Sequence, residues 1–277
     1  MCEFCTEHGE GKKWYLQMKN YAEELLYEEL SARQKSIAGT TTRLEWTNRF
    51  WETFVLPAIT GVSPAQETAS SAPQGPEDRT VEHFGQVLPI EDVEQVIDRV
   101  DSITRMPCGC RFSSTGLADR RYCFGLGIDK WGILGRFPDA ASSLEVLDKE
   151  EARRIFRQFD QEGLFHSIWT GVTPYVVGMC NCDRDCGAYR GYLVSAGSQS
   201  FFRAEYVGTV DWDLCTGCKS CISQCQFGSL LYSSALAKVC IEPTRCFGCG
   251  LCRAACPTEA IALVPRQEHP AAASIWR

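Results

Sequence analysis

Long apolar runs are missing from this chain of 277 residues, and the longest fall far short of the roughly 20 residues that a membrane-spanning helix needs. The first residues contain no basic segment followed by an apolar run, so we expect no signal peptide. Basic residues are not in excess either, since 28 Lys and Arg stand against 35 Asp and Glu and the net charge is −7. Without a long basic stripe, binding to nucleic acid is disfavoured.

The usual signatures of a substrate or nucleotide site are also missing. The segment 9–13 (GEGKK) lacks the Gly-x4-Gly-Lys-Ser/Thr pattern of a phosphate-binding loop. There is no Rossmann glycine fingerprint, no nucleophile elbow and no His-Glu-x2-His. The sequence therefore gives no sign of a flavin or nicotinamide site, and because it has no substrate-site motif of its own we expect the protein to work in a complex.

Cysteine, by contrast, is abundant, with 17 residues. Many cysteines without an export signal favour reduced thiols and metal binding over disulfides. Thiolates bind metal only if they stay reduced until the metal arrives, so we expect the protein to be cytoplasmic.

Two cysteine runs of identical spacing lie near the C-terminus. They are Cys215-x2-Cys218-x2-Cys221-x3-Cys225 and Cys246-x2-Cys249-x2-Cys252-x3-Cys256. Cys246 follows Cys215 by 31 residues, and Cys256 follows Cys225 by the same number. In such a run one loop wraps three thiolates around an iron–sulfur cube and a distant fourth cysteine completes the site.

This double run resembles the bacterial-type ferredoxin domain with two [4Fe–4S] clusters, over about a fifth of the chain (residues 206–264). In that family the fourth cysteine of each run ligates the other cluster. The implied ligands are Cys215, Cys218, Cys221 and Cys256 for one cluster, and Cys246, Cys249, Cys252 and Cys225 for the second. One departure is Gln226, which stands where the second run has Pro257 and loosens the backbone without removing a ligand.

Short apolar runs flank both cysteine loops and predict the short strands of two hairpins. They lie at 206–210 and 230–232 around the first loop, and at 239–241 and 260–264 around the second. Gly217, Gly248 and Gly250 let the backbone close on the sulfurs. The alternative is two zinc sites of four thiolates each, but structural zinc usually binds two separated cysteine pairs rather than tight triplets.

The N-terminal segment, 1–60, is predicted to be helical. Its first residues, Cys2, Cys5 and His8, either supply three metal ligands, to zinc for example, or belong to a frayed terminus with free thiols. Apolar periodicity predicts helices over 13–32 and 43–56, whose aromatic faces either pack into the core or dock on a partner. Residues 61–80, rich in Pro, Ser and Ala, predict a linker.

The middle module, 81–205, carries six further cysteines. A helix after Pro89, marked by apolar residues from Val93 to Ile103, precedes Cys108, Cys110 and Cys123. A second helix, capped by Asp148 and ended by Gly163, precedes strands at 164–169 and 175–179 and then Cys180, Cys182 and Cys186. His166, on the first of these strands, is expected to be structural.

These six cysteines lie beside Gly, Arg and Asp rather than inside apolar runs, which favours a metal centre over plain core packing. The expected ligands of a third [4Fe–4S] cluster are Cys108, Cys110, Cys180 and Cys182, with Cys123 and Cys186 next. A redox-active pair or a zinc site is the alternative. Arg111 and Arg184 are expected either to offset cluster charge or to form surface ion pairs with Asp183 or Asp185. The arrangement is similar to bacterial and archaeal iron–sulfur proteins in which Cys-x-Cys-Arg and Cys-Asn-Cys elements precede a two-cluster ferredoxin domain.

The sequence thus predicts an α+β protein with N-terminal helices, a middle α/β module, a ferredoxin-type domain of two pseudo-symmetric ββ/helix halves, and a surface tail over 265–277. Its predicted function is to relay single electrons to or from a larger redox enzyme. A reductase in its own right, with a catalytic cluster or reactive cysteine pair in the middle module, is the alternative. A zinc-stabilised interaction module is a third possibility.

Overall fold

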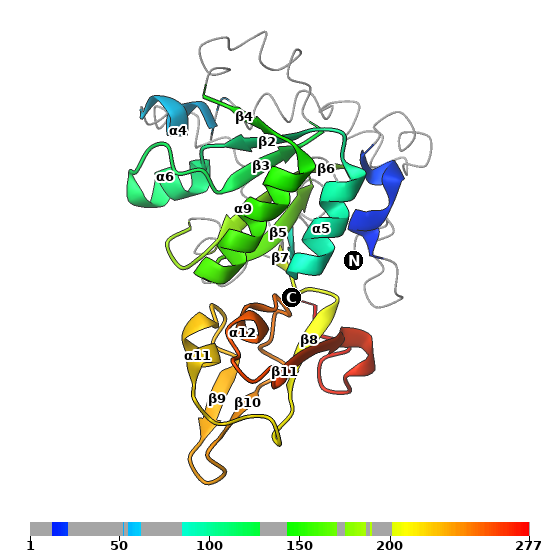
Figure 1. Cartoon of the computed structure of the whole chain (residues 1–277). Coiled ribbons are helices and arrows are strands. Elements are labelled where there is room, and N and C mark those ends of the chain that lie inside the picture. Colours follow the sequence, from blue (N-terminus) through cyan, green and yellow to red (C-terminus); the bar gives the residue numbers. More distant parts are fainter. Residues whose placement is uncertain are drawn as a thin grey trace, which may run out of the picture.

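The computed structural model consists of a seven-stranded sheet with its helices and a smaller C-terminal domain packed against one end of it (Figure 1). The ranges described are 13–21, 52, 55–61, 85–127, 143–170, 175–186, 189 and 201–276. None of the helices in these ranges has the length and hydropathy needed to cross a bilayer. The mixture of helices and antiparallel sheets confirms the predicted α+β class.

The sheet of the middle module has the strand order β4-β2-β3-β6-β5-β1-β7. All neighbouring strands are antiparallel except β1 and β7. The predicted α/β organisation of this module is therefore wrong, because helices packed on an antiparallel sheet make an α+β unit. The elements are β1 Gly85–Leu88, α5 Ile90–Arg99, β2 Ile103–Met106, α6 Gly109–Thr115, β3 Cys123–Leu126, β4 Glu145–Leu147, α9 Lys149–Glu162, β5 Phe165–Thr170, β6 Val176–Cys182 and β7 Phe201–Phe202.

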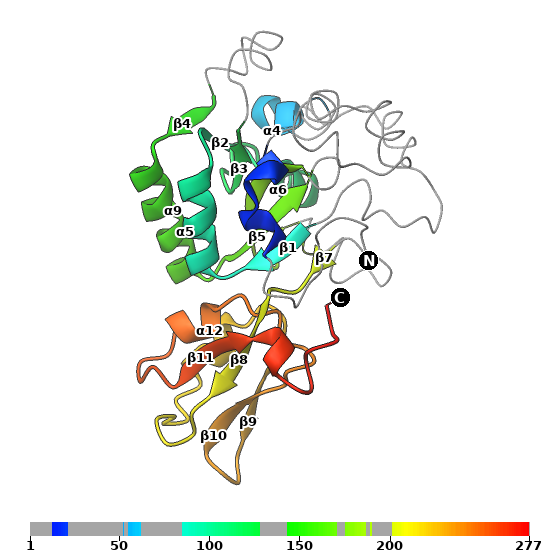
Figure 2. The same cartoon turned by 90° about the vertical axis from the view of Figure 1, so that its right-hand side faces the viewer.

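Helices α5 and α9 lie side by side on one face of the sheet (Figures 1 and 2). The predicted ends of α9 are confirmed: the Asp148 carboxylate accepts the Glu151 amide at 2.8 Å, and Gly163 ends the helix in the left-handed conformation. The predicted extension of α5 to Ile103 is wrong. The chain becomes extended at Val100, and Ile103 joins the same apolar core from β2.

The first described segment, 13–21, forms two 3₁₀ turns, η1 Trp14–Leu16 and η2 Met18–Tyr21, instead of the predicted α-helix. In an α-helix, backbone amides would donate to the carbonyls of this segment. Here the side-chain amide of Asn20 donates to the Trp14 carbonyl, and the hydroxyl of Tyr21 donates to the Tyr15 carbonyl. The neighbouring Trp14 and Tyr15 are both fully buried, which the one-sided pattern did not predict. This segment packs on the middle module, where the Tyr15 hydroxyl donates to Asp92 at 2.6 Å.

Little of the predicted helix 43–56 and linker 61–80 lies within the described residues. Helix α4, Leu56–Thr60, begins with Pro57 in its first turn and ends at Gly61 in the left-handed conformation. Val55 belongs to a buried cluster with Met106 and Cys108, on the side of the sheet that carries α6. Residues 22–51, 53–54 and 62–84, which include the rest of both predictions, lie outside the described ranges.

The C-terminal domain contains two small sheets and two short helices. Its elements are β8 Tyr206–Val210, α11 Ser220–Gln224, β9 Leu230–Ser233, β10 Lys238–Ile241, α12 Leu251–Ala254, β11 Ile261–Pro265 and the 3₁₀ turn η7 Arg266–Glu268. The strands around each cysteine loop do not pair with each other as a hairpin. Instead β8 pairs with β11 and β9 with β10, so each sheet joins one strand from either side of the repeat.

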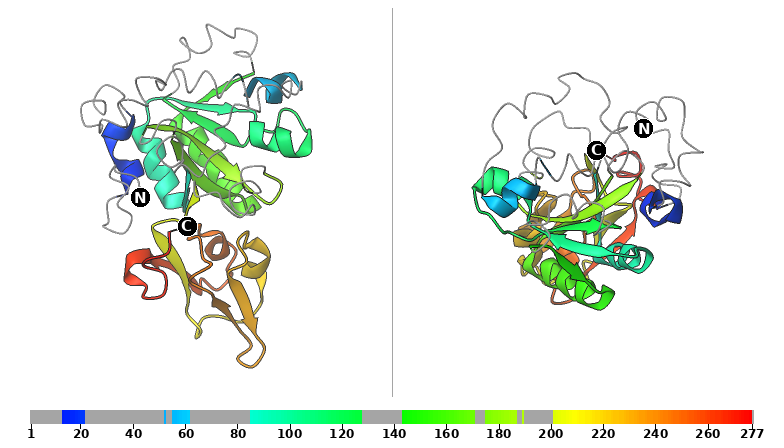
Figure 3. Two further views of the ribbon diagram at one scale, coloured as in Figure 1. Left: turned by 180° about the vertical axis from the view of Figure 1, so that it is seen from behind. Right: turned by 90° about the horizontal axis from the view of Figure 1, so that it is seen from above.

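The C-terminal domain meets the middle module at α12, which lies below the ends of α5 and α9 in two perpendicular views (Figures 1 and 2). An ion pair between Arg253 of α12 and Glu91 of α5 joins the two parts. The tail was predicted to lie on the surface, but Arg266 and Ala272 are fully buried in it. The tail turns back towards the module, and the Arg203 amide donates to the Trp276 carbonyl at 2.8 Å (Figure 3).

Candidate metal centres

The first cavity lies beside α11 in the C-terminal domain and has an empty volume of about 300 Å³. Three of its cysteines come from the loop that leads into α11 and the fourth comes from the end of the other run. They are Cys215, Cys218, Cys221 and Cys256. A turn prepares the entry to this loop, because the Asp211 carboxylate accepts the Asp213 amide at 2.8 Å.

The second cavity lies beside α12 and has the same empty volume, about 300 Å³. Its four cysteines are Cys225, Cys246, Cys249 and Cys252. Phe227, Phe247 and Leu263 supply much of the remaining wall. The two cavities thus gather the same two sets of four thiols that the sequence resemblance implies.

Glycine is required where each cysteine loop passes another segment of backbone. Gly217 and Gly248 have φ values of +71° and +72°. A Cβ atom at Gly217 would lie 2.1 Å from the carbonyl oxygen of Ala237, in the turn before β10, and one at Gly248 would lie 2.1 Å from that of Tyr206, in β8. A side chain at either position would therefore push the loop away from the backbone that it passes.

Backbone amides point at several of the cavity sulfurs. The Ser229 amide donates to the Cys225 sulfur at 3.3 Å, and the Ala260 amide donates to the Cys256 sulfur at 3.3 Å. The Gly208 amide donates to Cys246 at 3.4 Å. Such bonds stabilise negative charge on sulfur.

Burial raises the pKa of Cys221 to about 11 and that of Cys252 to about 12. These thiols are therefore neutral at pH 7 until a metal displaces their protons.

The arrangement of the thiols separates a polyatomic group from a single ion. A zinc ion is held by four thiolates that each lie about 2.3 Å from it. Among the described residues, no three His, Cys, Asp or Glu side chains converge closely enough to hold one metal ion. A donor set of three clustered cysteines and a remote fourth fits an iron–sulfur cube better than zinc.

Residues 214–260 match the family model of the 4Fe-4S dicluster domain. The C-terminal part of the chain is a 4Fe-4S dicluster domain of the ferredoxin type. The match covers less than a fifth of the chain and says nothing about the middle module.

Curated relatives share short segments with this chain. An archaeal-type glutamate synthase [NADPH] of Thermotoga maritima is 40% identical over 57 residues, which are 21% of this chain and 11% of that protein. The indolepyruvate oxidoreductase subunit IorA of Pyrococcus abyssi is 35% identical over 86 residues, 31% of this chain and 12% of that protein. The chain therefore spans only about a tenth of the length of these oxidoreductases.

The six cysteines of the middle module lie together on the face of the sheet opposite α5 and α9. We call Cys108, Cys110, Cys123, Cys180, Cys182 and Cys186 the thiol cluster. Cys123 on β3 and Cys180 on β6 are register partners with sulfurs 3.7 Å apart, and Cys182 points to the same side as Cys180. The sulfurs of Cys182 and Cys186 are 3.3 Å apart.

Helix α6 brings the remaining thiols to the thiol cluster. Cys108 is the residue before α6, and Cys110 lies in the first turn. Hydrogen bonds with Cys123 and Cys186, together with burial, raise the pKa of Cys108 well above its usual range. The thiol cluster contains the four predicted ligands, Cys108, Cys110, Cys180 and Cys182. It also contains Cys123 and Cys186, so the structure brings together all six thiols.

Arg111 of α6 accompanies the thiol cluster. It is 6% exposed and pairs with Asp183 at 3.0 Å, so the expected ion pair forms, but in a buried place rather than on the surface. Its Nε and Nη2 atoms have no hydrogen-bond partner among the described residues. Arg184 contacts the dicluster domain instead, where its guanidinium donates to the Cys225 carbonyl at 3.2 Å.

Several other predicted residues lie away from these sites. Cys2, Cys5 and His8 are outside the described residues. His166 is buried on the helix side of the sheet, where its ring bonds Asn181 at 2.6 Å, as expected of a structural histidine. Cys240 is half-buried on β10 and lines neither cavity.

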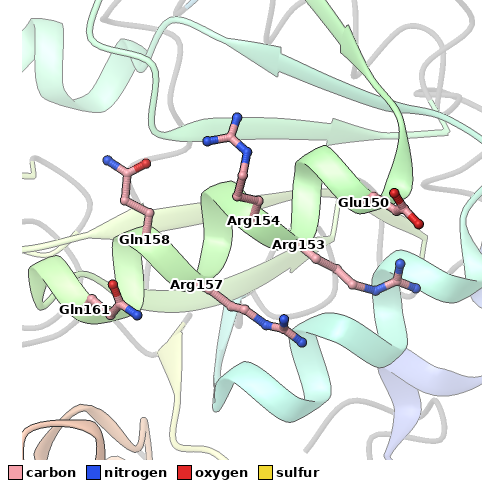
Figure 4. A pocket seen from close by; sticks show the side chains of 6 residues that line it. All are labelled: Glu150, Arg153, Arg154, Arg157, Gln158 and Gln161. Atoms are coloured by element: carbon pink, nitrogen blue, oxygen red, sulfur yellow. The ribbon is translucent and has the colours of Figure 1, made fainter.

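A surface hollow on α9 contains no cysteine. Its lining residues, shown in Figure 4, are Glu150, Arg153, Arg154, Arg157, Gln158 and Gln161. Two of its arginines pair with α5, Arg153 with Asp98 and Arg157 with Glu94, so these charges join the helices.

Sequence reasoning missed the residues that connect the dicluster domain to the middle module. Phe227 and Phe247 stack with ring centroids 4.2 Å apart, and Phe165 of β5 lies 5.0 Å from Phe227. Arg266 is fully buried and donates to the Cys246 carbonyl at 2.8 Å. No motif marks these positions, because each acts through contacts with distant parts of the chain.

Proposed function

We propose that this chain is an iron–sulfur electron-transfer protein, in which the dicluster domain holds two [4Fe–4S] cubes. One observation carries the proposal: two cavities of similar volume are each lined by four cysteines, three from one run and one from the other. Cys215, Cys218, Cys221 and Cys256 would hold one cube, and Cys225, Cys246, Cys249 and Cys252 the other. A cube of this kind takes up and releases single electrons.

The internal repeat supports this assignment. Gly217 and Gly248 are 31 residues apart, and so are Ala237 and Tyr206, whose carbonyls they approach. Ser229 and Ala260, the donors to Cys225 and Cys256, have the same offset. Two pseudo-symmetric ββ/helix halves, β8-α11-β9 and β10-α12-β11, would place equivalent groups around each cube.

The thiol cluster is the proposed place of a third [4Fe–4S] centre. Four of its six thiols suffice for a cube, with Cys108, Cys110, Cys180 and Cys182 as the first choice and Cys123 and Cys186 next. The unpartnered Nε and Nη2 atoms of Arg111 support a negatively charged group here, since buried donors are rarely left without acceptors. Zinc at Cys2, Cys5 and His8 stays a prediction.

The proposed partner is a larger redox enzyme that acts on the substrate. The matched relatives are a glutamate synthase [NADPH] and a subunit of an indolepyruvate oxidoreductase. Their similarity to this chain supports a role in oxidation and reduction reactions. Within the chain, hydrogen bonds to sulfur and nearby charge would set the potentials of the cubes.

A second function is favoured by the sulfurs of Cys182 and Cys186, which lie 3.3 Å apart within a group that has two thiols more than a cube needs. Such a pair could pass two electrons and two protons to an oxidised substrate and close to a disulfide. The reduced cubes could then return two electrons, one at a time, while the sulfurs take up two protons from water. The chain would then be a reductase in its own right.

Iron and acid-labile sulfide counting on the anaerobically purified full chain tests the proposal. We expect about twelve irons per chain if the thiol cluster holds a third cube, and about eight if only the dicluster domain is loaded. Cys108→Ala and Cys182→Ala should each remove about four irons, whereas Cys240→Ala, outside both cavities, should remove none. Unchanged iron in both middle variants would refute the third centre, and a chain without labile sulfide would refute the function itself.

A further inference from the structure

Two guanidinium groups, that of the fully buried Arg266 and that of the half-buried Arg203, lie against the wall of the second cavity. Arg266 is fully buried and donates to the carbonyls of Cys246 at 2.8 Å, Tyr206 at 2.7 Å and Ala204 at 2.8 Å. Arg203 lies with its guanidinium 4.5 Å from the centre of the Phe247 ring, which lines the cavity. Neither arginine belongs to the cysteine motif, and Arg266 comes from the tail.

Arg266 keeps its charge at neutral pH despite its burial. Burial lowers the pKa of Arg266 to about 10, which leaves it protonated at pH 7. Burial also lowers the pKa of Arg203. The buried carboxylate of Glu205 lies in the same region and accepts a hydrogen bond from Gln86 at 3.0 Å. Arg203 and Arg266 thus lie beside Glu205, and Arg184 and Arg253 also approach this wall, at the Cys225 carbonyl and beside Gly250.

The charges around the first cavity are more exposed to water. Lys219 is exposed and lies over the Tyr232 ring, and Lys238 donates to the Cys215 carbonyl. Asp211 and Asp213, both exposed, oppose these lysines. Lys238 is half-buried like Arg203, but the first cavity has no counterpart of the fully buried Arg266 among these residues. Because water screens exposed charges strongly, the charges at the first cavity affect it less than Arg266 affects the second.

The second cavity is also the one that adjoins the middle module. Cys249 of its wall shares a buried cluster with Cys182, Cys186 and Phe165. The guanidinium of Arg184 bridges the same junction to the Cys225 carbonyl. Cys218 of the first cavity, in contrast, is exposed.

We propose that Arg203 and Arg266 raise the reduction potential of the centre in the second cavity above that of the centre in the first. Reduction adds a negative charge, and a positive charge held in a poorly solvated place stabilises the reduced state. Electrons that enter the dicluster domain therefore collect beside the thiol cluster. This inference rests on the proposed function, because it requires both cavities to hold a redox centre.

The test is a redox titration of the loaded full chain followed by EPR, with Cys218→Ser and Cys249→Ser used to assign the signals of the first and second centres. In the parent, the second centre should be reduced first. Each of the variants Arg203→Gln and Arg266→Gln should lower the reduction potential of the second centre by about 59 mV. At a given solution potential, this lowers the ratio of reduced to oxidised second centre about tenfold relative to the first centre. Arg154→Gln, an exposed arginine on α9, should shift neither centre.

Arg266→Lys separates charge from structure. A lysine retains the positive charge but loses the planar fork that donates to four carbonyls, so the potential should stay near that of the parent. If Arg266→Gln fails to take up iron, Arg203→Gln and Arg266→Lys still decide the question.

The inference is overturned if the first centre is the more easily reduced in the parent, or if neither glutamine variant that loads iron shifts the second centre. A parent without iron and labile sulfide would instead refute the proposed function.

Discussion

Replacing Gly248 by alanine tests whether the close approach of loop and strand holds the second cavity together. The residue has φ +72°, and an added Cβ would lie 2.1 Å from the Tyr206 carbonyl oxygen. Gly116 offers a matched control, since it has φ +70° but nothing within 4 Å of an added Cβ. The two substitutions share the backbone strain and differ only in the overlap.

The expected costs follow from these two contributions. Left-handed backbone costs about 1 kcal/mol in Gly116→Ala. Gly248→Ala adds an overlap with a backbone atom that cannot rotate away, at the upper end of overpacking costs, about 3 kcal/mol. With each kcal/mol lowering Tm by about 3 °C in a chain of this size, Gly116→Ala should lose about 3 °C and Gly248→Ala about 12 °C.

Anaerobic thermal melting followed by far-UV circular dichroism, at one scan rate, measures these shifts. Iron counting on the same samples should show that Gly248→Ala loses about four irons and Gly116→Ala none. Gly217→Ala should behave like Gly248→Ala but affect the signal of the first centre. If Gly248→Ala melted and loaded iron like Gly116→Ala, the argument from close approach would be refuted.

Two further predictions concern buried polar groups. Burial and the neighbouring Asp92 raise the pKa of Tyr15, so the folded chain keeps this proton above pH 10 while the unfolded chain loses it. Stability should therefore fall by about 1.4 kcal/mol per pH unit above pH 10 on account of this group. We expect Tyr15→Phe to have a lower Tm than the parent at pH 8. When Tm is followed from pH 8 to 11.5, the difference in Tm between the variant and the parent should become smaller above pH 10. A constant difference in Tm would contradict the assignment. Arg111→Met should reduce the iron content from about twelve to about eight if its unpartnered nitrogens face a metal centre. Arg154→Met is the surface control, and full iron content in Arg111→Met would show that the guanidinium serves its ion pair with Asp183 and its contact with the Tyr122 ring rather than a metal centre.

The wall of the second cavity also depends on residues that are far apart in the sequence. Arg266, Phe247 and Arg203 meet there because the tail folds back over the start of β8. Neither spacing nor composition distinguishes these residues from ordinary surface and core positions. The effect that we propose for these arginines depends on burial, and burial is a property of the assembled fold.

Local signals in the sequence predicted those features that form from residues close together in the chain. The spacing of Cys215 to Cys225 identified the cysteine loops, because a loop that short can present its thiols in only a few ways. Asp148 and Gly163 marked both ends of α9, because caps act within one helical turn. The apolar stripe of α5 identified its buried face, although not the residue at which the helix ends.

The tertiary structure alone decided how distant segments combine. Strands β8 and β11 pair across the whole dicluster domain, where local reading predicted hairpins around each loop. The thiol cluster draws cysteines from residues 108 to 186 onto one face of an antiparallel sheet, a grouping that depends on the order of β3, β6 and β5. Strand order and burial result from the packing energy of the entire chain, and no short segment of the sequence encodes them.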